Sequence, residues 1–569
     1  MHKIQQKTTY FFLCMVIILI FMLHQCSLKK GTFVDELLTY DLSNRQSPRV
    51  EYMVSYITST SPSAIWNDIN DILKNGKENS RIYKNFKEVQ KQQTENSLWH
   101  DKDYFSRFIT AEKGNQFDFL SVMYNAVYDS APPFYYYWIH FICSLFPGTF
   151  SLWYGLTINI IFLMLTCALL YYLADQYFGG TKYAFLITLC YAMSIGGIAT
   201  LMIIRMYAVY TFFVLAFLGI NLHIIYNGFA FTKKSRIAYI LCAVLGFYTQ
   251  YYFVIFAFFL VGTIITFLFF GRKYRSKIKP YVISSLAAAI LSLVIWPFSI
   301  KHIFFDSFGS STFSNAASGD FLHKITVYLQ IVAKSLFAGR SWLLALLSLS
   351  AAFGTIWRLR RSRQNRNGEK RMEPSISILK ALLLFLPSAG YLFLVAISAP
   401  FLADRYIMCI FPVILLGMYY LFRTLLSGFT RHAFPILCSF GAFLTVSALI
   451  TLPHPYTYPD QAQKNSFIKN AENAVCIYIS ENNGWMYKSC LDIMGACSKT
   501  ALLFPEQIEE APPIPLSPGE YDKVLICIAF PFPQEETLQK TMEHFGLEDK
   551  EVTMFSRETD GYANLYLLQ

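Results

Sequence analysis

Two adjacent carboxylates, Asp35 and Glu36, follow the first hydrophobic segment in the stretch 33–41, and no Lys or Arg lies within four residues of either. A carboxylate of this kind can act as a general base that removes a proton from an attacking hydroxyl or amine. The alternative is structural, because acidic residues are favoured in the first turn of a helix by the helix dipole. The pair by itself leaves both alternatives open.

Two arginines form a second candidate group. Arg205 with Tyr207 and Arg405 with Tyr406 lie at predicted ends of hydrophobic segments. Guanidinium groups stay charged and match the geometry of phosphate oxygens, so the two arginines suit an anionic lipid headgroup. The alternative is that each arginine extends from a span end toward the phosphates of the surrounding lipid.

The composition restricts the kind of protein that positions these residues. Charged residues make up 15% of the 569-residue chain and hydrophobic residues 54%, whereas soluble domains contain about 25% charged residues. The chain is therefore an integral membrane protein. Its net charge of +11 indicates no nucleic-acid partner, because the basic residues gather in short loops between apolar segments, as cytoplasmic loops do.

Metal ligands are not evident in the sequence. The twelve cysteines form no CxxC pair and no Cys/His cluster with zinc-ligand spacing, so we predict no metal site and no cofactor. A requirement for a divalent ion stays open, because Asp101, Asp103 and Asp118 can either bind an ion or remain solvated, and solvation is the usual state of surface carboxylates.

About eleven hydrophobic segments have spanning or near-spanning length. The first, within 1–27, has a basic start and no small-residue cleavage site, so we interpret it as an uncleaved anchor. The sequence predicts a polytopic α-helical membrane protein in which the other spans lie at 151–174, 183–200, 206–226, 237–250, 252–270, 281–298, 342–357, 376–397, 406–422 and 433–452.

The basic loops predict the orientation of these spans. The loops 233–236, 272–279 and 358–363 are strongly basic and belong in the cytoplasm, which places the N-terminus there as well. Asp35, Arg205, Arg405 and the C-terminal part of the chain then face outside. The segment 132–146 is apolar but too short to span, and we interpret it as an aromatic helix in the outer interface.

Four regions follow from this pattern: an anchor at 1–27, an outer loop with juxtamembrane helices at 28–150, a multi-span domain at 151–452 and a small extracytoplasmic α/β domain at 453–569. In the last region, 474–479 and 524–529 have the composition of buried strands, and 534–545 that of a helix. Its four cysteines can pair outside the cell or remain thiols; they are Cys476, Cys490, Cys497 and Cys527.

The ordered motifs resemble the bacterial members of the GT-C class of membrane glycosyltransferases, relatives of protein O-mannosyltransferase and aminoarabinose transferase. They cover roughly the first three quarters of the chain. Many relatives carry His or Lys before the Pro-Pro pair, where this chain has Ala131. The matching motifs are Val34-Asp35-Glu36, Ala131-Pro132-Pro133-Phe134-Tyr135-Tyr136, Arg205-Met206-Tyr207, Tyr248-Thr249-Gln250-Tyr251-Tyr252 and Arg405-Tyr406.

This resemblance implies transfer of a sugar from a polyprenyl-phosphate carrier to an unknown envelope acceptor at the outer face of the plasma membrane. Asp35 would be the general base, with inversion at the anomeric carbon, and Glu36 would share the proton or orient the acceptor. Arg205 and Arg405 would stabilise the departing phosphate. The remaining residues expected at the donor are Tyr135, Tyr136, Tyr207 and Tyr406.

Two other functions stay open at the level of sequence. A catalytically inert envelope scaffold would use the outer loop and the C-terminal domain as interaction surfaces, and Ala131 favours this alternative. A flippase or transporter of lipid-linked glycans would line a transbilayer path with charged residues. The middles of the predicted spans are instead Leu, Ile, Phe, Ala and Tyr, which favours a site at the outer surface.

Overall fold

The structure is a computed structural model that describes residues 2–46, 98–129, 131–304, 320–340, 374–480, 486–517, 519–557 and 562–569, with a few residues between 61 and 84. The predicted span at 342–357 and the basic loop at 358–363 lie outside these residues. The chain divides into two compact units. The first contains residues 1–29, 129–135 and 155–457, and the second contains residues 30–128, 136–154 and 458–569.

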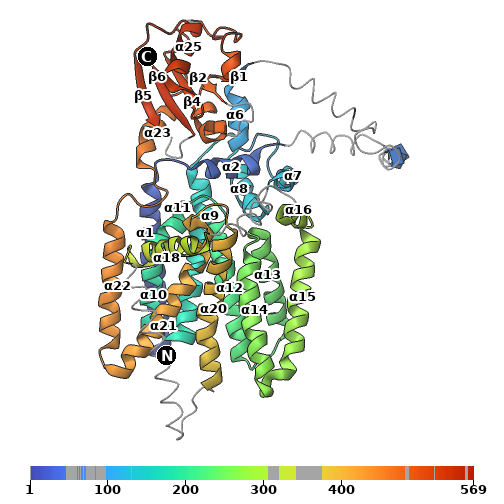
Figure 1. Ribbon diagram of the computed structural model, residues 1–569, viewed down its shortest axis with the longest axis vertical. Helices are drawn as coiled ribbons and strands as arrows, with labels where there is room; N and C mark the ends of the chain where they lie inside the picture. Colours follow the sequence, from blue (N-terminus) through green and yellow to red (C-terminus); the bar gives the residue numbers. More distant parts are fainter. Residues whose placement is uncertain are drawn as a thin grey trace. The chain divides into compact units, whose positions relative to one another are not determined.

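The first unit is a bundle of long apolar helices (Figure 1). In the described part of the chain, eight helices are long and apolar enough to cross a membrane, and a bent pair would make a ninth. The bundle helices are α1 His2–Ser27, α9 Leu152–Leu173, α10 Thr181–Ala192, α11 Ile195–Met202, α12 Tyr207–Tyr226, α13 Lys233–Thr249, α14 Phe253–Phe270, α15 Ile278–Ile295, α20 Pro374–Ser398, α21 Phe411–Phe429 and α22 Ala433–Ile450.

These helices confirm the predicted polytopic α-helical fold, with two differences in detail. The segment predicted at 183–200 is the bent pair α10 and α11, which meet at 59°. The short segment predicted at 237–250 is α13, a helix of 17 residues whose first turn contains Lys233, Lys234 and Arg236. A helix satisfies its own backbone hydrogen bonds, which is the condition for crossing the hydrocarbon layer.

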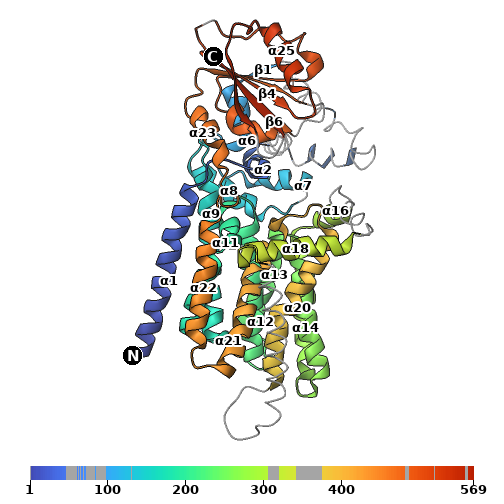
Figure 2. The ribbon, with the colours of Figure 1, turned by 60° about the vertical axis from the view of Figure 1, so that its left-hand side comes forward.

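Shorter helices complete the first unit. A π-helical turn, η1 (Ala174–Phe178), extends α9, and α16 (Ser299–Phe304) follows α15. The helix α18 (Phe321–Phe337) was not predicted, and it lies across the direction of the long helices in both views (Figures 1 and 2). Its residues 321–337 fall in a connection of low basic charge, so neither hydropathy nor charge identified it.

One buried and one partly buried cation at one end of the bundle were also missed. Lys380 of α20 is 4% exposed, and its Nζ donates to the carbonyl oxygen of Tyr177 at 2.5 Å. Arg423 of α21 donates to the carbonyl oxygen of Phe178 at 3.2 Å. These cations satisfy carbonyl groups at the C-terminal end of α9 and η1, where the helix dipole favours positive charge. They hold three helices together rather than line a path.

The second unit is built on a six-stranded sheet of order β1-β3-β2-β4-β6-β5. The three central strands β3, β2 and β4 are parallel, and the outer strands are antiparallel to their neighbours. The predicted strands 474–479 and 524–529 are confirmed as parts of β2 and β4. The strands are β1 Trp99–Asp101, β2 Ala474–Ile479, β3 Lys499–Leu503, β4 Lys523–Ala529, β5 Val552–Arg557 and β6 Ala563–Leu568.

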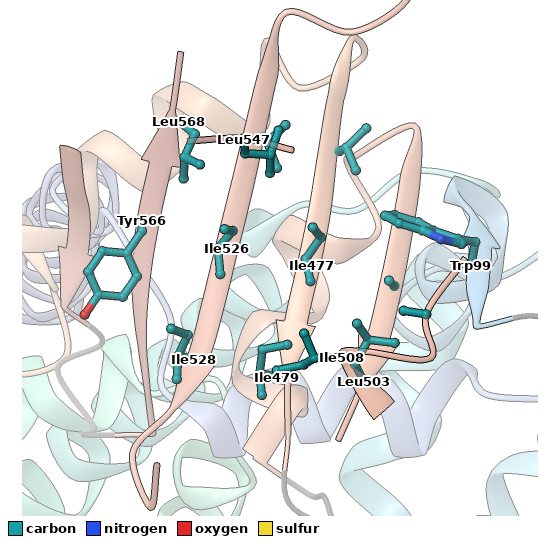
Figure 3. Packing of buried hydrophobic residues seen from close by; sticks show 14 residues of the cluster. Trp99, Ile477, Ile479, Leu503, Ile508, Ile526, Ile528, Leu547, Tyr566 and Leu568 are labelled. Atoms are coloured by element: carbon teal, nitrogen blue, oxygen red, sulfur yellow. The ribbon is translucent and has the colours of Figure 1, made fainter. Parts of the chain in front are cut away.

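One face of this sheet carries the hydrophobic core of the unit (Figure 3). Ile477 and Ile526 occupy paired positions on neighbouring strands, and alternate residues of each strand point the same way. The predicted helix α25 (Gln534–Phe545) packs on this face through Leu538, Met542 and Phe545. Cys476 and Cys527 point to the other face of the sheet, where their buried Sγ atoms are 4.0 Å apart.

Edge strand β1 comes from the long segment between α1 and α9, about 400 residues before its partner. Trp99 pairs with Ala501 of β3, and its indole nitrogen donates to the carbonyl oxygen of Pro512 at 2.9 Å. The helices of the second unit are α2 Val34–Asn44, α6 Lys102–Ile109, α7 Phe119–Tyr128, α8 Phe134–Leu145, α23 Ala462–Ile468, α24 Leu491–Met494 and α25. The first two residues of α8 belong to the first unit.

Candidate active site

The two candidate carboxylates stand in the first turn of α2 but have different environments. The side chain of Glu36 is fully buried, and its Oε2 accepts a hydrogen bond from the backbone N–H of Phe33 at 2.8 Å. Glu36 therefore caps its own helix, as a Glu at the third helical position often does. Asp35 is only partly buried. Of the two carboxylates, Asp35 is the more accessible to a substrate.

A third carboxylate in the same stretch, Asp41, has a structural role. Its side chain is fully buried between two cations. Arg45 binds it with two nitrogens, Nε lying 2.6 Å from Oδ1 and Nη2 contacting Oδ2, and Lys488 Nζ lies 3.1 Å from Oδ2. Burial lowers the pKa of Arg45, but the Asp41 carboxylate outweighs this effect and raises it. The ion pairs fix the C-terminal end of α2 to the turn at Met486–Cys490.

The segment before α2 is clamped to the chain near residue 461. The side-chain amide of Gln461 accepts from Thr32 N–H at 2.9 Å and donates to Thr32 O at 3.1 Å. Asn465 Nδ2 donates to the carbonyl oxygen of Lys30 at 2.6 Å. Gly31 lies against this clamp, because an added Cβ would stand 2.2 Å from Gln461 Oε1 and 2.6 Å from its Cβ.

Replacing Gly31 by Ala is therefore expected to displace the segment that begins α2. We expect a destabilisation of about 1–3 kcal/mol, typical of overpacking, together with reduced activity of the protein. The measurement is thermal unfolding of the purified chain in detergent. Gly262→Ala is the matched control, since an added Cβ there meets open space. Equal melting temperatures for the Gly31→Ala and Gly262→Ala variants would contradict the proposed clamp.

A buried histidine supports the other side of α2. His140 of α8 is 3% exposed, and its Nδ1 lies 3.3 Å from Asn44 Oδ1. Asn44 in turn donates to the carbonyl oxygen of Ile109 at 3.1 Å. Burial lowers the pKa of His140, although the Asp118 charge and a backbone hydrogen bond with Ser43 oppose this effect. The imidazole is therefore neutral at pH 7.

The lowered pKa of His140 predicts a loss of stability in acid. A group with a depressed folded-state pKa stabilises the fold above its unfolded value, about 6.5, and this contribution is lost as pH falls through the folded value. The melting temperature of the wild type should fall more steeply from pH 7 to pH 5 than that of His140→Gln. Parallel pH profiles for the two proteins would show that His140 does not titrate in this way.

In the first unit, Arg405 lies in a network that joins three distant segments. Asp404, Arg405 and Tyr406 form a 3₁₀ turn, η3. Tyr456 OH donates to Asp404 Oδ1 at 2.6 Å, and Lys29, which is 6% exposed, donates through Nζ to Tyr456 O at 2.8 Å. Burial raises the pKa of Asp404, and the hydrogen bond from Tyr456 opposes this effect. Tyr456 has a left-handed φ of 59°, a strained conformation that these contacts hold.

Aromatic residues of the bundle helices fix the turn that contains Arg405. Tyr391 OH donates to the carbonyl oxygen of Tyr406 at 2.7 Å, and Tyr210 OH bonds to Tyr391 OH at 3.2 Å. The rings of Tyr252 and Tyr406 meet edge to face with centroids 5.9 Å apart. The turn that presents Arg405 is thus held by hydroxyl groups from α12 and α20.

Arg205 lies at the break between α11 and α12, and buried amide contacts shape that break. Asn159 Nδ2 donates to the carbonyl oxygens of Leu201 and Ile203 at 3.0 and 2.7 Å. Tyr135 OH donates to Asn159 Oδ1 at 3.1 Å. The amide contacts of Asn159 therefore fix the backbone of the break in which Arg205 lies. Burial and the neighbouring Asp404 carboxylate raise the pKa of Tyr456, and the charge of Arg405 opposes this effect.

The predicted site residues fall into two groups. Arg205, Tyr207, Arg405, Tyr406 and Tyr135 belong to the first unit, and Asp35, Glu36 and Tyr136 belong to the second. Tyr135 and Tyr136 are each 1% exposed, and their role at the donor stays a prediction. Sequence reasoning missed the contributions of Lys29, Asp404, Tyr456 and Asn159. The only local signal among them was the position of Asp404 beside Arg405.

The described residues contain no group of three His, Cys, Asp or Glu side chains placed to hold a metal ion. Two of the aspartates with open roles have protein partners. Asp101 Oδ1 lies 2.5 Å from Lys499 Nζ, and Asp118 Oδ1 accepts from the N–H of Ser121 at 3.1 Å. Both carboxylates stabilise local structure.

Comparisons with known proteins give matches in structure. No protein-family model matches the chain, and no curated protein matches its sequence. ArnT from Cupriavidus metallidurans bound to undecaprenyl phosphate matches 77% of this chain and 88% of its own, with 10% identity and a TM-score of 0.45. The apo form of the same protein matches 77% and 87%, with 9% identity and a TM-score of 0.45. The chain is thus similar in fold to these two ArnT structures.

Proposed function

We propose that the protein is a glycosyltransferase that moves a sugar from a polyprenyl-phosphate-linked donor to an envelope acceptor at the outer face of the membrane. The observation that carries this proposal is the difference in environment between the two adjacent carboxylates at the start of α2. Glu36 is buried and bonded to Phe33 N–H, whereas Asp35 stays partly accessible. The capping role of Glu36 makes Asp35, the more accessible of the two carboxylates, the better candidate for the base.

In the proposed reaction, Asp35 takes the proton from the acceptor hydroxyl or amine as that group attacks the anomeric carbon of the donor sugar. The bond between the anomeric carbon and the phosphate oxygen breaks, and the polyprenyl phosphate leaves with the electron pair. Displacement in one step inverts the configuration at the anomeric carbon. No covalent intermediate with the protein forms in this scheme.

Arg405 and Arg205 are proposed to stabilise the negative charge on the departing phosphate. Preorganised cations are effective in this role because they need no rearrangement when charge develops. The hydrogen bonds to Asp404, Tyr406 and Ile203 support the idea of a preorganised site. One of the matched ArnT structures is bound to undecaprenyl phosphate, a lipid of the carrier class proposed here.

The test is label transfer with purified protein in proteoliposomes. Polyprenyl-phosphate sugars carrying a radiolabel in the sugar are supplied with a membrane extract as acceptor source, and labelled products are separated by class. We expect the wild type to transfer the labelled sugar. The rate of transfer should depend on the length of the polyprenyl chain of the carrier. Absence of transfer with every carrier-linked sugar would favour the scaffold alternative, while movement of intact labelled donor across the bilayer would favour a flippase.

A further inference from the structure

An open apolar groove runs along the first unit between α14 and α20, which lie side by side (Figure 2). Its volume is about 660 Å³. The wall from α14 includes Phe258, which is 67% exposed, and Phe270, which is 78% exposed. On the other side Leu382 and Leu386 of α20 complete the wall. Large exposed apolar side chains in a concave surface indicate a nonpolar occupant.

The length of the groove matches one leaflet of a bilayer. Its wall extends along α14 from Phe258 to Phe270, and at 1.5 Å per residue this distance is about 18 Å. The hydrocarbon core of a membrane is about 30 Å thick, so one leaflet is about 15 Å. The lining contains two hydroxyl groups, those of Thr263 and Thr266, and the Thr263 hydroxyl donates to the carbonyl oxygen of Phe259 at 2.6 Å.

One end of the groove is basic. Lys273 and Tyr274 belong to its lining, and Arg275, Lys277 and Lys279 follow within six residues. No Asp or Glu occurs in the sequence from residue 176 to residue 305, so the basic turn at 272–279 lies in a stretch of the chain whose formal charges are all positive. Basic groups at the end of an apolar groove between membrane helices suit an anionic lipid headgroup.

We propose that this groove binds an anionic glycerophospholipid of the leaflet on the side of the basic turn. Its acyl chain would lie along α14 and its phosphate would contact Lys273. The inference is independent of the proposed glycosyl transfer, because the groove contains none of the residues assigned to that reaction. The site would make the phospholipid a structural ligand of the protein rather than its substrate.

Gly262 allows the groove to be filled without disturbing the helix. An added Cβ at Gly262 meets no atom within 4 Å, although this residue lines the groove. Gly262→Phe should therefore fold and occupy the space of the acyl chain. Ala287→Phe is the matched control, since Ala287 is exposed on α15 and lies outside the groove lining. Lys234→Ala is the control for Lys273→Ala, because Lys234 is exposed at the start of α13 and lies outside the lining and the basic end of the groove.

The experiment measures lipid retention by native mass spectrometry on the delipidated full-length protein. Phosphatidylglycerol, phosphatidylcholine with the same acyl chains, and polyprenyl phosphate are added separately and in competition. We expect retention of phosphatidylglycerol over phosphatidylcholine, with a loss of about fivefold in Lys273→Ala, the effect of one lysine near an anionic lipid surface. Gly262→Phe should lose retention to a similar or greater extent, and both controls should retain lipid as the wild type does.

Three results would overturn the proposal. Equal retention of phosphatidylglycerol and phosphatidylcholine would remove the headgroup specificity. Wild-type retention in Gly262→Phe would show that lipid binds elsewhere. Displacement of phosphatidylglycerol by polyprenyl phosphate, with loss of polyprenyl binding in Gly262→Phe, would assign the groove to the donor chain instead. Melting temperatures of the four variants show whether each is folded before its retention is compared.

Discussion

Asp35→Asn is expected to lower the rate of glycosyl transfer by about 10²- to 10⁴-fold, the usual contribution of a general base. Asn has nearly the same shape as Asp but does not accept a proton at neutral pH, so the loss should appear in kcat with little change in KM for the donor. The rate is measured by label transfer from a polyprenyl-phosphate sugar. Transfer at the wild-type rate in Asp35→Asn would rule out Asp35 as the base.

Glu36→Gln is the matched control for this result. The Gln side chain keeps an oxygen that can accept the hydrogen bond from Phe33 N–H, which Glu36 accepts at 2.8 Å, and Gln is also found at this position of a capping box. The variant should therefore retain most of the transfer activity. If Glu36→Gln lost as much activity as Asp35→Asn at an unchanged melting temperature, the two carboxylates would have to share the proton.

Arg405→Ala is expected to reduce kcat by about 10²- to 10³-fold, the loss that follows removal of one preorganised group from a developing negative charge. Arg405→Lys should restore only part of the rate, because the ammonium group lacks the planar fork that binds two phosphate oxygens. The assay is again label transfer, with donor affinity measured separately by binding of a polyprenyl phosphate. An unchanged kcat in Arg405→Ala would assign Arg405 to the lipid interface.

Tyr456→Phe separates two effects on the rate of transfer, that of the positive charge of Arg405 and that of the position of the turn containing it. This variant keeps the ring and removes the hydroxyl that donates to Asp404 at 2.6 Å, while Arg405 remains. A smaller loss of rate than in Arg405→Ala is expected, because the turn keeps its bond from Tyr391 to the carbonyl oxygen of Tyr406. A loss as large as that of Arg405→Ala would mean that the position of the turn, and not the cation, limits catalysis.

Local sequence patterns were sufficient for the framework of the protein. The first hydrophobic helix, most spans and helix α25 were predicted correctly, because hydropathy and helical periodicity act over windows of about 18 residues or fewer. The buried strands within 474–479 and 524–529 were equally recognisable by their continuous apolar runs. The edge strand β1 was missed, since Trp99–Asp101 contains only three residues and its pairing with β3 is a long-range contact.

The sequence by itself determined that this is a polytopic membrane protein with a small sheet domain, and it brought Asp35, Glu36 and the two arginines to attention. Only the tertiary structure decided that Glu36 caps α2, that Asp41 is bound by Lys488 across 447 residues, and that Asp404 is bonded to Tyr456. The physical reason is range. The apolar pattern that buries a helix lies in residues close together in the sequence. The hydrogen-bond partner of a polar group depends instead on which distant segment the fold brings within about 3 Å.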